Sequence, residues 1–130
     1  MMRIVARSKI QRPRITDKNL RYEGSIAIDK RLLRLADIAP SEQVQVVNVS
    51  TGARFETYVI EGGPGDIKLN GGAARLGEVG DELIIIAYAL MDSTELARHR
   101  ILKVNVDEHN QPREQRARSK KQRAKSGKTP

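Results

Sequence analysis

The chain has 130 residues, a formal net charge of +8 and no cysteine. This length fits one domain, and the lack of cysteine excludes disulfides and thiolate metal sites and suits a reducing compartment. No apolar stretch approaches the length of a transmembrane helix and the N-terminus lacks the apolar segment of a signal peptide, so we expect a cytoplasmic protein.

The strands expected from the sequence are short and joined by Gly-rich turns. Alternating apolar and polar residues, or short apolar runs, predict strands at 2–9, 25–28, 43–49, 54–60, 67–69, 82–90 and 101–106. Pro13 is expected to put residues 10–16 at an edge or a bend. Ser50-Thr51-Gly52 is typical of a hairpin turn between the third and fourth strands.

Helical signals are few. Asp29 is expected to cap a helix over residues 30–36 that ends before Pro40. Single turns or short helices are also expected at 16–20, 73–76 and 94–98. Many short strands with few helices favour a mainly β fold, a small closed barrel with one or two helices.

The positive charge is concentrated at the C-terminus. Residues 111–130 hold eight of the 24 basic residues and one of the 16 acidic ones, which leaves residues 1–110 with 16 basic against 15 acidic. Hydrophobic periodicity stops at Asp107, so we expect a folded domain over 1–107 and a disordered basic tail over 108–130. A nearly neutral domain argues against a dedicated nucleic-acid surface.

Gly24-Ser25 is the only Gly-Ser pair in the chain, and it lies at the start of the strand expected at 25–28. An isolated pair of this kind usually marks an ordinary turn. A serine hydroxyl can, however, attack the preceding carbonyl and form an ester if a fixed donor stabilises the oxyanion. Elimination then leaves dehydroalanine, which hydrolyses to a pyruvoyl ketone that forms a Schiff base with amines and withdraws electrons.

Further motifs accompany this pair in a characteristic order: Lys9-Ile10, Tyr22-Glu23-Gly24-Ser25, residues 48–58, residues 70–76 and Gly80-Asp81. Together they closely resemble the aspartate 1-decarboxylase family over roughly residues 2–107. The resemblance implies a six-stranded double-psi β-barrel that cleaves itself between Gly24 and Ser25. It also implies a homotetramer with sites between subunits that converts L-aspartate to β-alanine and CO2, for pantothenate and coenzyme A biosynthesis.

The resemblance assigns roles to five residues of this sequence. Ser25 is implied to be the precursor of the pyruvoyl group and the Schiff-base site, and no metal is implied. Tyr58 is implied to be the proton donor, and Thr57 a hydroxyl for self-processing and substrate contact. Arg54 is implied to bind the substrate carboxylate, a geometry that suits a guanidinium, with Lys9 as a second cation.

A loop of small residues is implied to contact the substrate through backbone N–H groups; it consists of Asn70, Gly71, Gly72 and Ala73. Gly72 stands where the family often has alanine. Gln11 stands where the family often has histidine, so no role for that histidine carries over. Tyr22 is either a pocket wall or a core residue, and whether cleavage needs a helper protein is left open.

Each of these residues also has a plainer structural interpretation. Arg54 could be a solvated strand residue, Lys9 a strand-edge lysine, and Thr57 simply a good strand former. Thr57 and Tyr58 are adjacent, so on a regular strand they face opposite ways. If both act at one site, the strand is locally irregular or the two residues serve sites on different subunits. His99 and His109 are expected to be solvated.

The main alternative is a small β-barrel that binds DNA through its basic tail. The nearly neutral residues 1–110 and the presence of only one Phe and three Tyr count against it. A third interpretation is an unprocessed family member acting as a binding scaffold, against which the intact Ser25, Thr57 and Tyr58 count.

Overall fold

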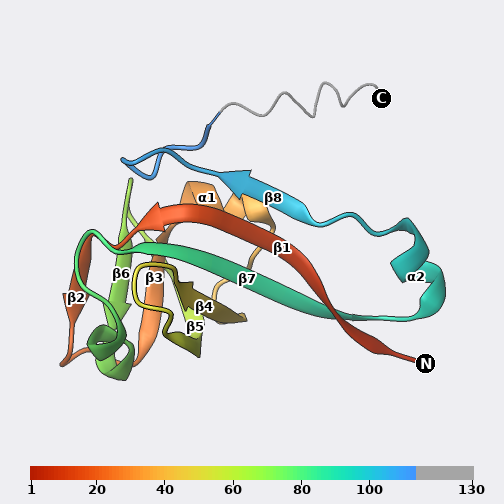
Figure 1. Ribbon diagram of the computed structural model, residues 1–130, viewed down its shortest axis with the longest axis horizontal. Coiled ribbons are helices and arrows are strands. Elements are labelled where there is room, and N and C mark those ends of the chain that lie inside the picture. Colours follow the sequence, from red (N-terminus) through yellow and green to blue (C-terminus); the bar gives the residue numbers. More distant parts are fainter. Residues whose placement is uncertain (114–130) are drawn as a thin grey trace.

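The computed structural model describes residues 1–113, so that most of the expected basic tail, residues 114–130, lies outside the described part (Figure 1). The described chain is mainly β with short helices, as predicted. Its strands are β1 (Arg3–Arg14), β2 (Asp17–Asn19), β3 (Ser25–Asp29), β4 (Gln43–Asn48), β5 (Arg54–Gly62), β6 (Ile67–Asn70), β7 (Glu82–Met91) and β8 (Leu102–Asn105). Its helices are α1 (Lys30–Ala36), the 3-10 helix η1 (Gly71–Leu76) and α2 (Ser93–Arg98).

Within residues 1–113 the strands form one 8-stranded sheet with the order β2-β6-β3-β5-β4-β7-β1-β8. The residue patterns predict seven of these strands, and the strand that they miss is β2. The pairings β1–β8, β2–β6 and β3–β5 are parallel and the others are antiparallel. Parallel neighbours need a crossover, and α1 with β4 forms the one between β3 and β5. The long strands β1 and β7 run side by side across the molecule (Figure 1).

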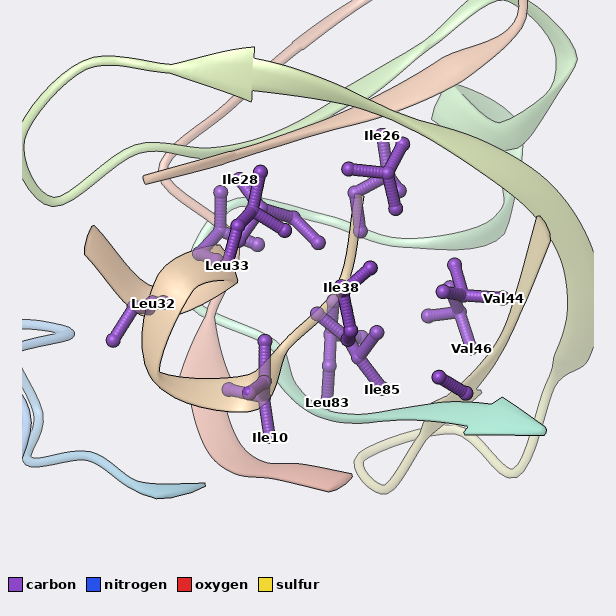
Figure 2. Close-up of a cluster of buried hydrophobic side chains, with 14 of the residues drawn as sticks. Ile10, Ile26, Ile28, Leu32, Leu33, Ile38, Val44, Val46, Leu83 and Ile85 are labelled. Atoms are coloured by element: carbon purple, nitrogen blue, oxygen red, sulfur yellow. The ribbon is translucent and has the colours of Figure 1, made fainter. Parts of the chain in front are cut away.

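One hydrophobic core lies between the sheet and α1 (Figure 2). Its largest fully buried side chains are Ile10, Ile15, Ile26, Ile28, Leu32, Ile67, Leu69, Leu83, Ile85, Val44, Val46 and Val59. Each such side chain contributes about 1.5–3 kcal/mol on burial, so this core is the main stabilising element. The core therefore fixes which face of each strand points outward.

Helix α1 begins and ends as its sequence predicts. The Asp29 carboxylate accepts a hydrogen bond from Arg31 N at 2.8 Å, which is the expected N-cap. Leu32, Leu33 and Ala36 form its buried face. The helix ends at Asp37, whose backbone is left-handed with φ 56°. Strand β3 and helix α1 thus follow each other directly, with Asp29 at the junction.

Two local expectations are wrong. Residues 17–19 form β2 instead of a helical turn, because the hydroxyl of Thr16 donates to Ile67 O (3.2 Å) and accepts from Ile67 N (3.0 Å), which draws the segment onto β6. Strand β1 continues through Pro13, because a register shift between Gln11 and Arg14 takes the proline out of the ladder with β7.

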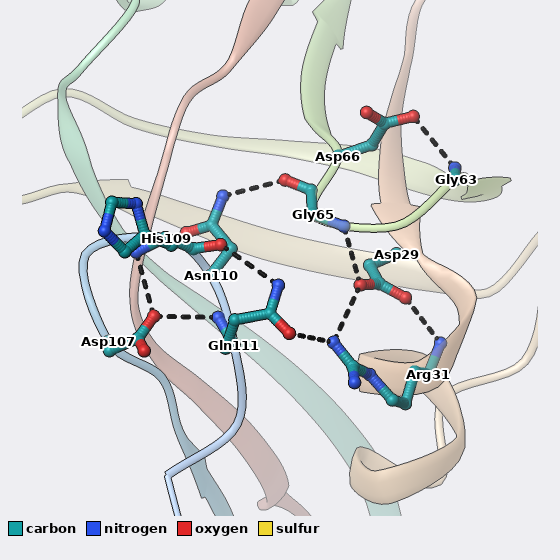
Figure 3. Close-up of polar contacts among 9 residues, drawn as sticks. All are labelled: Asp29, Arg31, Gly63, Gly65, Asp66, Asp107, His109, Asn110 and Gln111. Carbon is teal, nitrogen blue, oxygen red and sulfur yellow. Dashed lines mark hydrogen bonds and ion pairs between the residues drawn. The ribbon is translucent and has the colours of Figure 1, made fainter.

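The folded domain also extends beyond residue 107, where it was predicted to end. Asn110 is 1% exposed and its amide donates to Arg14 O (2.9 Å) and Gly65 O (3.0 Å), while its oxygen accepts from Arg14 N (2.7 Å) (Figure 3). Val106 forms a bridge with Pro112. Residues 108–113 therefore belong to the domain, because polar contacts that leave no hydrophobic pattern hold them in place.

One histidine differs from expectation. His99 is half-buried, with Nε2 2.8 Å from Ala6 O beside the irregularity in β1, so it is not simply solvated. His109 is exposed, as predicted. No helix within residues 1–113 is both long and apolar enough to cross a membrane.

Candidate active site

Ser25 is the first residue of β3, between β5 and β6, and its side chain is fully buried. Its hydroxyl donates to the main-chain oxygen of Glu23 at 3.0 Å and accepts from Asn70 Nδ2 at 3.1 Å. Two bonds from opposite directions fix one orientation of the hydroxyl. The hydroxyl that the sequence predicts as the nucleophile is therefore held in one orientation, between Asn70 and the Glu23 oxygen.

The sheet register brings Asn70, Thr57 and Tyr58 to this bond. Ser25 pairs with Asn70 of β6. On the other side Ile26 pairs with Val59 of the parallel strand β5. When this register is continued toward the N-terminus, Ser25 lies opposite Tyr58 and Gly24 lies opposite Thr57. Ile26 and Val59 point into the core, and side chains alternate along a strand. Ser25, Asn70 and Tyr58 therefore share the outer face of the sheet.

Gly71 brings η1 directly against the chain at Gly24. Its φ is +65°, and a Cβ at this position would lie 2.6 Å from both Gly24 N and Gly24 Cα. Only glycine allows this approach. The close contact that the structure shows for this loop is made to the Gly24-Ser25 segment. Gly72 is exposed and Ala73 is packed against the core.

Thr57 and Tyr58 project from opposite faces of a regular strand. Residues 54–58 of β5 pair with β4 without a register shift, which rules out the locally irregular strand considered above. Thr57 shares the inner face with Phe55 and Val59, whereas Tyr58 points outward. Among residues 1–113, the Thr57 hydroxyl forms no hydrogen bond to the Gly24 carbonyl, although the register places the two residues side by side.

The hydroxyl of Tyr58 donates to Oε1 of Glu23 at 3.5 Å. Glu23 was not among the predicted functional residues, although it belongs to the motif that contains the scissile bond. Its side chain is exposed, and an exposed glutamate belongs to no hydrophobic pattern by which the sequence could have identified it. The structure thus adds a carboxylate to the group of side chains around Ser25.

Lys9 and Arg54 lie outside this group. Arg54 opens β5 and is exposed, about 13 Å along the strand from Tyr58 at ~3.3 Å per residue. Lys9 lies on β1, which β7, β4 and β5 separate from β3. Within residues 1–113 the structure therefore does not bring the two predicted carboxylate-binding cations to Ser25 of the same chain.

Tyr22 is a pocket wall and not a core residue. Its side chain is 53% exposed and lines a pocket of about 320 Å³ on the outer face of the sheet. Ala27 lies in this pocket, and its neighbours across the sheet are Lys68 and Ile60. Asn70 also lines the pocket, which connects it to the Ser25 hydroxyl.

Asn48 and Asp81, which both belong to the motifs of the family resemblance, hold the C-terminal end of η1 in place. Asn48 is fully buried, and its amide donates to Leu76 O at 3.1 Å and to Asp81 Oδ2 at 3.0 Å. This bond and the Glu78 N–H hold the pKa of Asp81 below its usual value. The end of η1 is thereby fixed, and with it the loop that begins at Asn70.

Gln11, which stands where the family often has histidine, is half-buried in β1, and its main-chain oxygen accepts from Val106 N at 3.3 Å. No cluster of three or more His, Asp or Glu side chains among residues 1–113 is arranged to hold a metal ion.

The fold and the site define a small mainly β protein with a buried, hydrogen-bonded serine hydroxyl at an internal Gly-Ser pair. Residues 1–113 match the family model described as aspartate decarboxylase. Proteins named aspartate 1-decarboxylase from Kosmotoga olearia and Thermoanaerobacter pseudethanolicus are 57% and 54% identical, over 86% of this chain and 97% of theirs. One from Syntrophobacter fumaroxidans is 51% identical over 86% of this chain and 92% of its own. The chain belongs to the aspartate decarboxylase family.

This membership confirms the resemblance seen in the sequence. It favours an enzyme of the decarboxylase class over a DNA-binding β-barrel.

Proposed function

We propose that this chain cleaves itself between Gly24 and Ser25 and uses the resulting pyruvoyl group to convert L-aspartate to β-alanine and CO2. The relatives' printed name supports the reaction. The observation that supports self-cleavage most directly is the buried Ser25 hydroxyl, oriented by Asn70 Nδ2 and the Glu23 oxygen. A serine in an ordinary turn would not need to be buried and held by two hydrogen bonds.

Cleavage starts when Ser25 Oγ bonds to the Gly24 carbonyl carbon and the C–N bond breaks, which gives an ester and a free amine. Loss of the Ser25 Cα proton and of the ester oxygen leaves Gly24 as a carboxylate and residue 25 as dehydroalanine. Water then converts dehydroalanine to the ketone and releases ammonia. Thr57, beside Gly24 in the register, supplies a hydroxyl that can stabilise the oxyanion of the first step.

The residues present fit a pyruvoyl group, because it is made from Ser25 in a buried position whose polar neighbour, Asn70, remains as a donor. A pyruvoyl ketone at this position would supply a carbonyl for the substrate amine and an electron sink for the loss of CO2. Tyr58 Oη then gives its proton to the carbon that carried the carboxylate. Backbone N–H groups of the 70–73 loop bind the substrate.

Lys9 and Arg54 complete the site from a neighbouring subunit in a homotetramer. Both project from the outer face of the sheet. Lys9 pairs with Ile86 and Arg54 pairs with Val47, and directly paired residues lie on the same face of a sheet. Ile86 lies outside the core cluster although it is only 8% exposed. An outer face with an apolar centre and cations at its sides suits a subunit interface next to an anionic substrate. The division of the site explains why one chain does not contain it whole.

The product β-alanine serves pantothenate and coenzyme A biosynthesis, and the enzyme works in the cytoplasm. A maturation helper is a candidate partner for the cleavage step. The basic tail makes at most weak contacts with nucleic acid; its residues from 114 onward lie outside the described part. Salt-dependent DNA binding that disappears in a chain ending at residue 113 would assign that contact to the tail alone.

Substitution of two residues separates cleavage from substrate binding. Ser25→Ala should abolish both cleavage and decarboxylation, whereas Arg54→Ala should be cleaved normally but bind aspartate poorly, with KM raised roughly tenfold or more for a lost charge-assisted pair. Mass spectrometry and β-alanine assays check both, with Ser93→Ala and Arg34→Ala as exposed controls. Unchanged aspartate affinity in Arg54→Ala would remove that residue from the site.

A further inference from the structure

Glu23 contacts both reacting partners of the proposed mechanism. Its main-chain oxygen accepts from the Ser25 hydroxyl at 3.0 Å, and its carboxylate accepts from the Tyr58 hydroxyl at 3.5 Å. It is also one residue before Gly24, next to the bond that is cut. The main-chain and side-chain contacts of one residue therefore connect the nucleophile of self-cleavage with the proton donor of the later decarboxylation.

Tyr58 needs a group to orient it. It is only half-buried, on the outer face of β5, and the described residues give its hydroxyl one partner, Glu23. Tyr88, on the same face of the sheet, is held by Gln45 at 2.8 Å instead. A proton donor acts efficiently only within hydrogen-bond reach of its target, and a free phenol on a sheet surface samples several rotamers.

We propose that the Glu23 carboxylate is the positioning residue for Tyr58, holding its hydroxyl at the Ser25 end of β3. This inference rests on the proposed function. When CO2 has left, Tyr58 Oη gives its proton to the substrate carbon and the phenolate takes a proton from solvent. Glu23 orients the donor without exchanging a proton itself.

The first test uses uncleaved protein, where activity plays no part. The chain contains three tyrosines, so carbon-13 labelling of the ring carbon that bears the hydroxyl gives three NMR signals in a Ser25→Ala background. Glu23→Ala should shift the Tyr58 signal and leave those of Tyr22 and Tyr88 in place. Glu56→Ala, at an exposed glutamate two residues before Tyr58 on the same strand face, is the matched control and should leave the Tyr58 signal in place.

The second test uses the self-cleaved enzyme. Glu23→Ala should still cleave, with KM within about twofold and kcat reduced roughly fivefold, the worth of one hydrogen bond of ~1 kcal/mol. Glu23→Gln keeps an acceptor oxygen and should recover most of the lost kcat. In D2O the normal enzyme should put deuterium on one face of the product carbon, and Glu23→Ala should give a mixture.

An unshifted Tyr58 signal, an unchanged kcat or a failure of Glu23→Ala to cleave would each overturn the inference. Tyr58→Phe separates it from the proposed function. If Tyr58→Phe loses kcat while Glu23→Ala does not, only the positioning role is wrong. If Tyr58→Phe keeps its kcat, the proton-donor role itself is wrong and the positioning role falls with it.

Discussion

Gly71 sets how closely η1 approaches the Gly24-Ser25 segment. Its positive φ and its contact with Gly24 are both closed to a residue with a side chain. The same contact places Asn70, the preceding residue, where its amide reaches the Ser25 hydroxyl. A single missing Cβ thus aligns the nucleophile with its donor.

Gly71→Ala should therefore slow self-cleavage and lower the free energy of unfolding by about 1–3 kcal/mol, because the added Cβ meets backbone atoms and the φ is strained. Gly72→Ala is the matched control, since a Cβ there would meet nothing within 4 Å. The cleaved fraction over time, followed by mass spectrometry, and urea denaturation check both. Equal cleavage rates in the two variants would show that the close approach of η1 is unimportant.

At the scale of elements, β3 is held at both ends. Ser25 pairs with Asn70 at its start, and at its end the Asp29 carboxylate accepts from Gly65 N at 2.8 Å and forms an ion pair with Arg31 (Figure 3). Asn110 binds the carbonyl of the same Gly65. The turn at 107–113 therefore supports the loop that fixes the register of β3.

This arrangement predicts different results for two truncations. A chain ending at Arg113 keeps every contact described here and should unfold at the same urea concentration as the full chain. A chain ending at Asp107 loses the three bonds of Asn110 and should lose about 2–4 kcal/mol, at ~0.5–1.5 kcal/mol for each net hydrogen bond. Asn110→Ala removes the same three side-chain bonds and should therefore lose about as much. Equal stability of both truncated chains would mean that the turn contributes nothing.

The elements that the sequence predicts are those with local signals. Alternation identified the strands, and Asp29 with the apolar residues of α1 identified that helix. The errors arose where distant partners decide the structure: Thr16 bonds to Ile67 and Asn110 to Arg14 and Gly65. Ser25, Asn70 and Tyr58 were predicted through the family resemblance, but their convergence follows only from the sheet register. Glu23 had no signal of its own.

At the scale of the whole molecule, the predicted site residues are spread over the outer face of the sheet. Tyr58 and Ser25 lie at one place, whereas Lys9 is three intervening strands away from β3. The outer face also bears exposed Ile4, Tyr88 and Leu90 on β1 and β7. Exposed apolar groups of this kind are typical of a surface covered by another subunit.

If neighbouring subunits share each site, inactive variants should complement each other. Ser25→Ala and Lys9→Ala subunits, each with little or no activity alone, should regain part of the activity when co-expressed in mixed assemblies, because some sites then combine an intact Ser25 with an intact Lys9. Native mass spectrometry confirms the mixing and a β-alanine assay measures the recovery. Mixed assemblies without recovered activity would place Lys9 and Ser25 of one chain at the same site.

The most direct test of the account is an intact mass spectrum of the purified, denatured protein. Cleavage between Gly24 and Ser25 predicts two chains, residues 1–24 and 25–130, the second with a ketone in place of its N-terminal amine. A normal serine at that new terminus would mean ester hydrolysis without formation of the pyruvoyl group. A single uncleaved chain of 130 residues, persisting in an active preparation, would contradict the account.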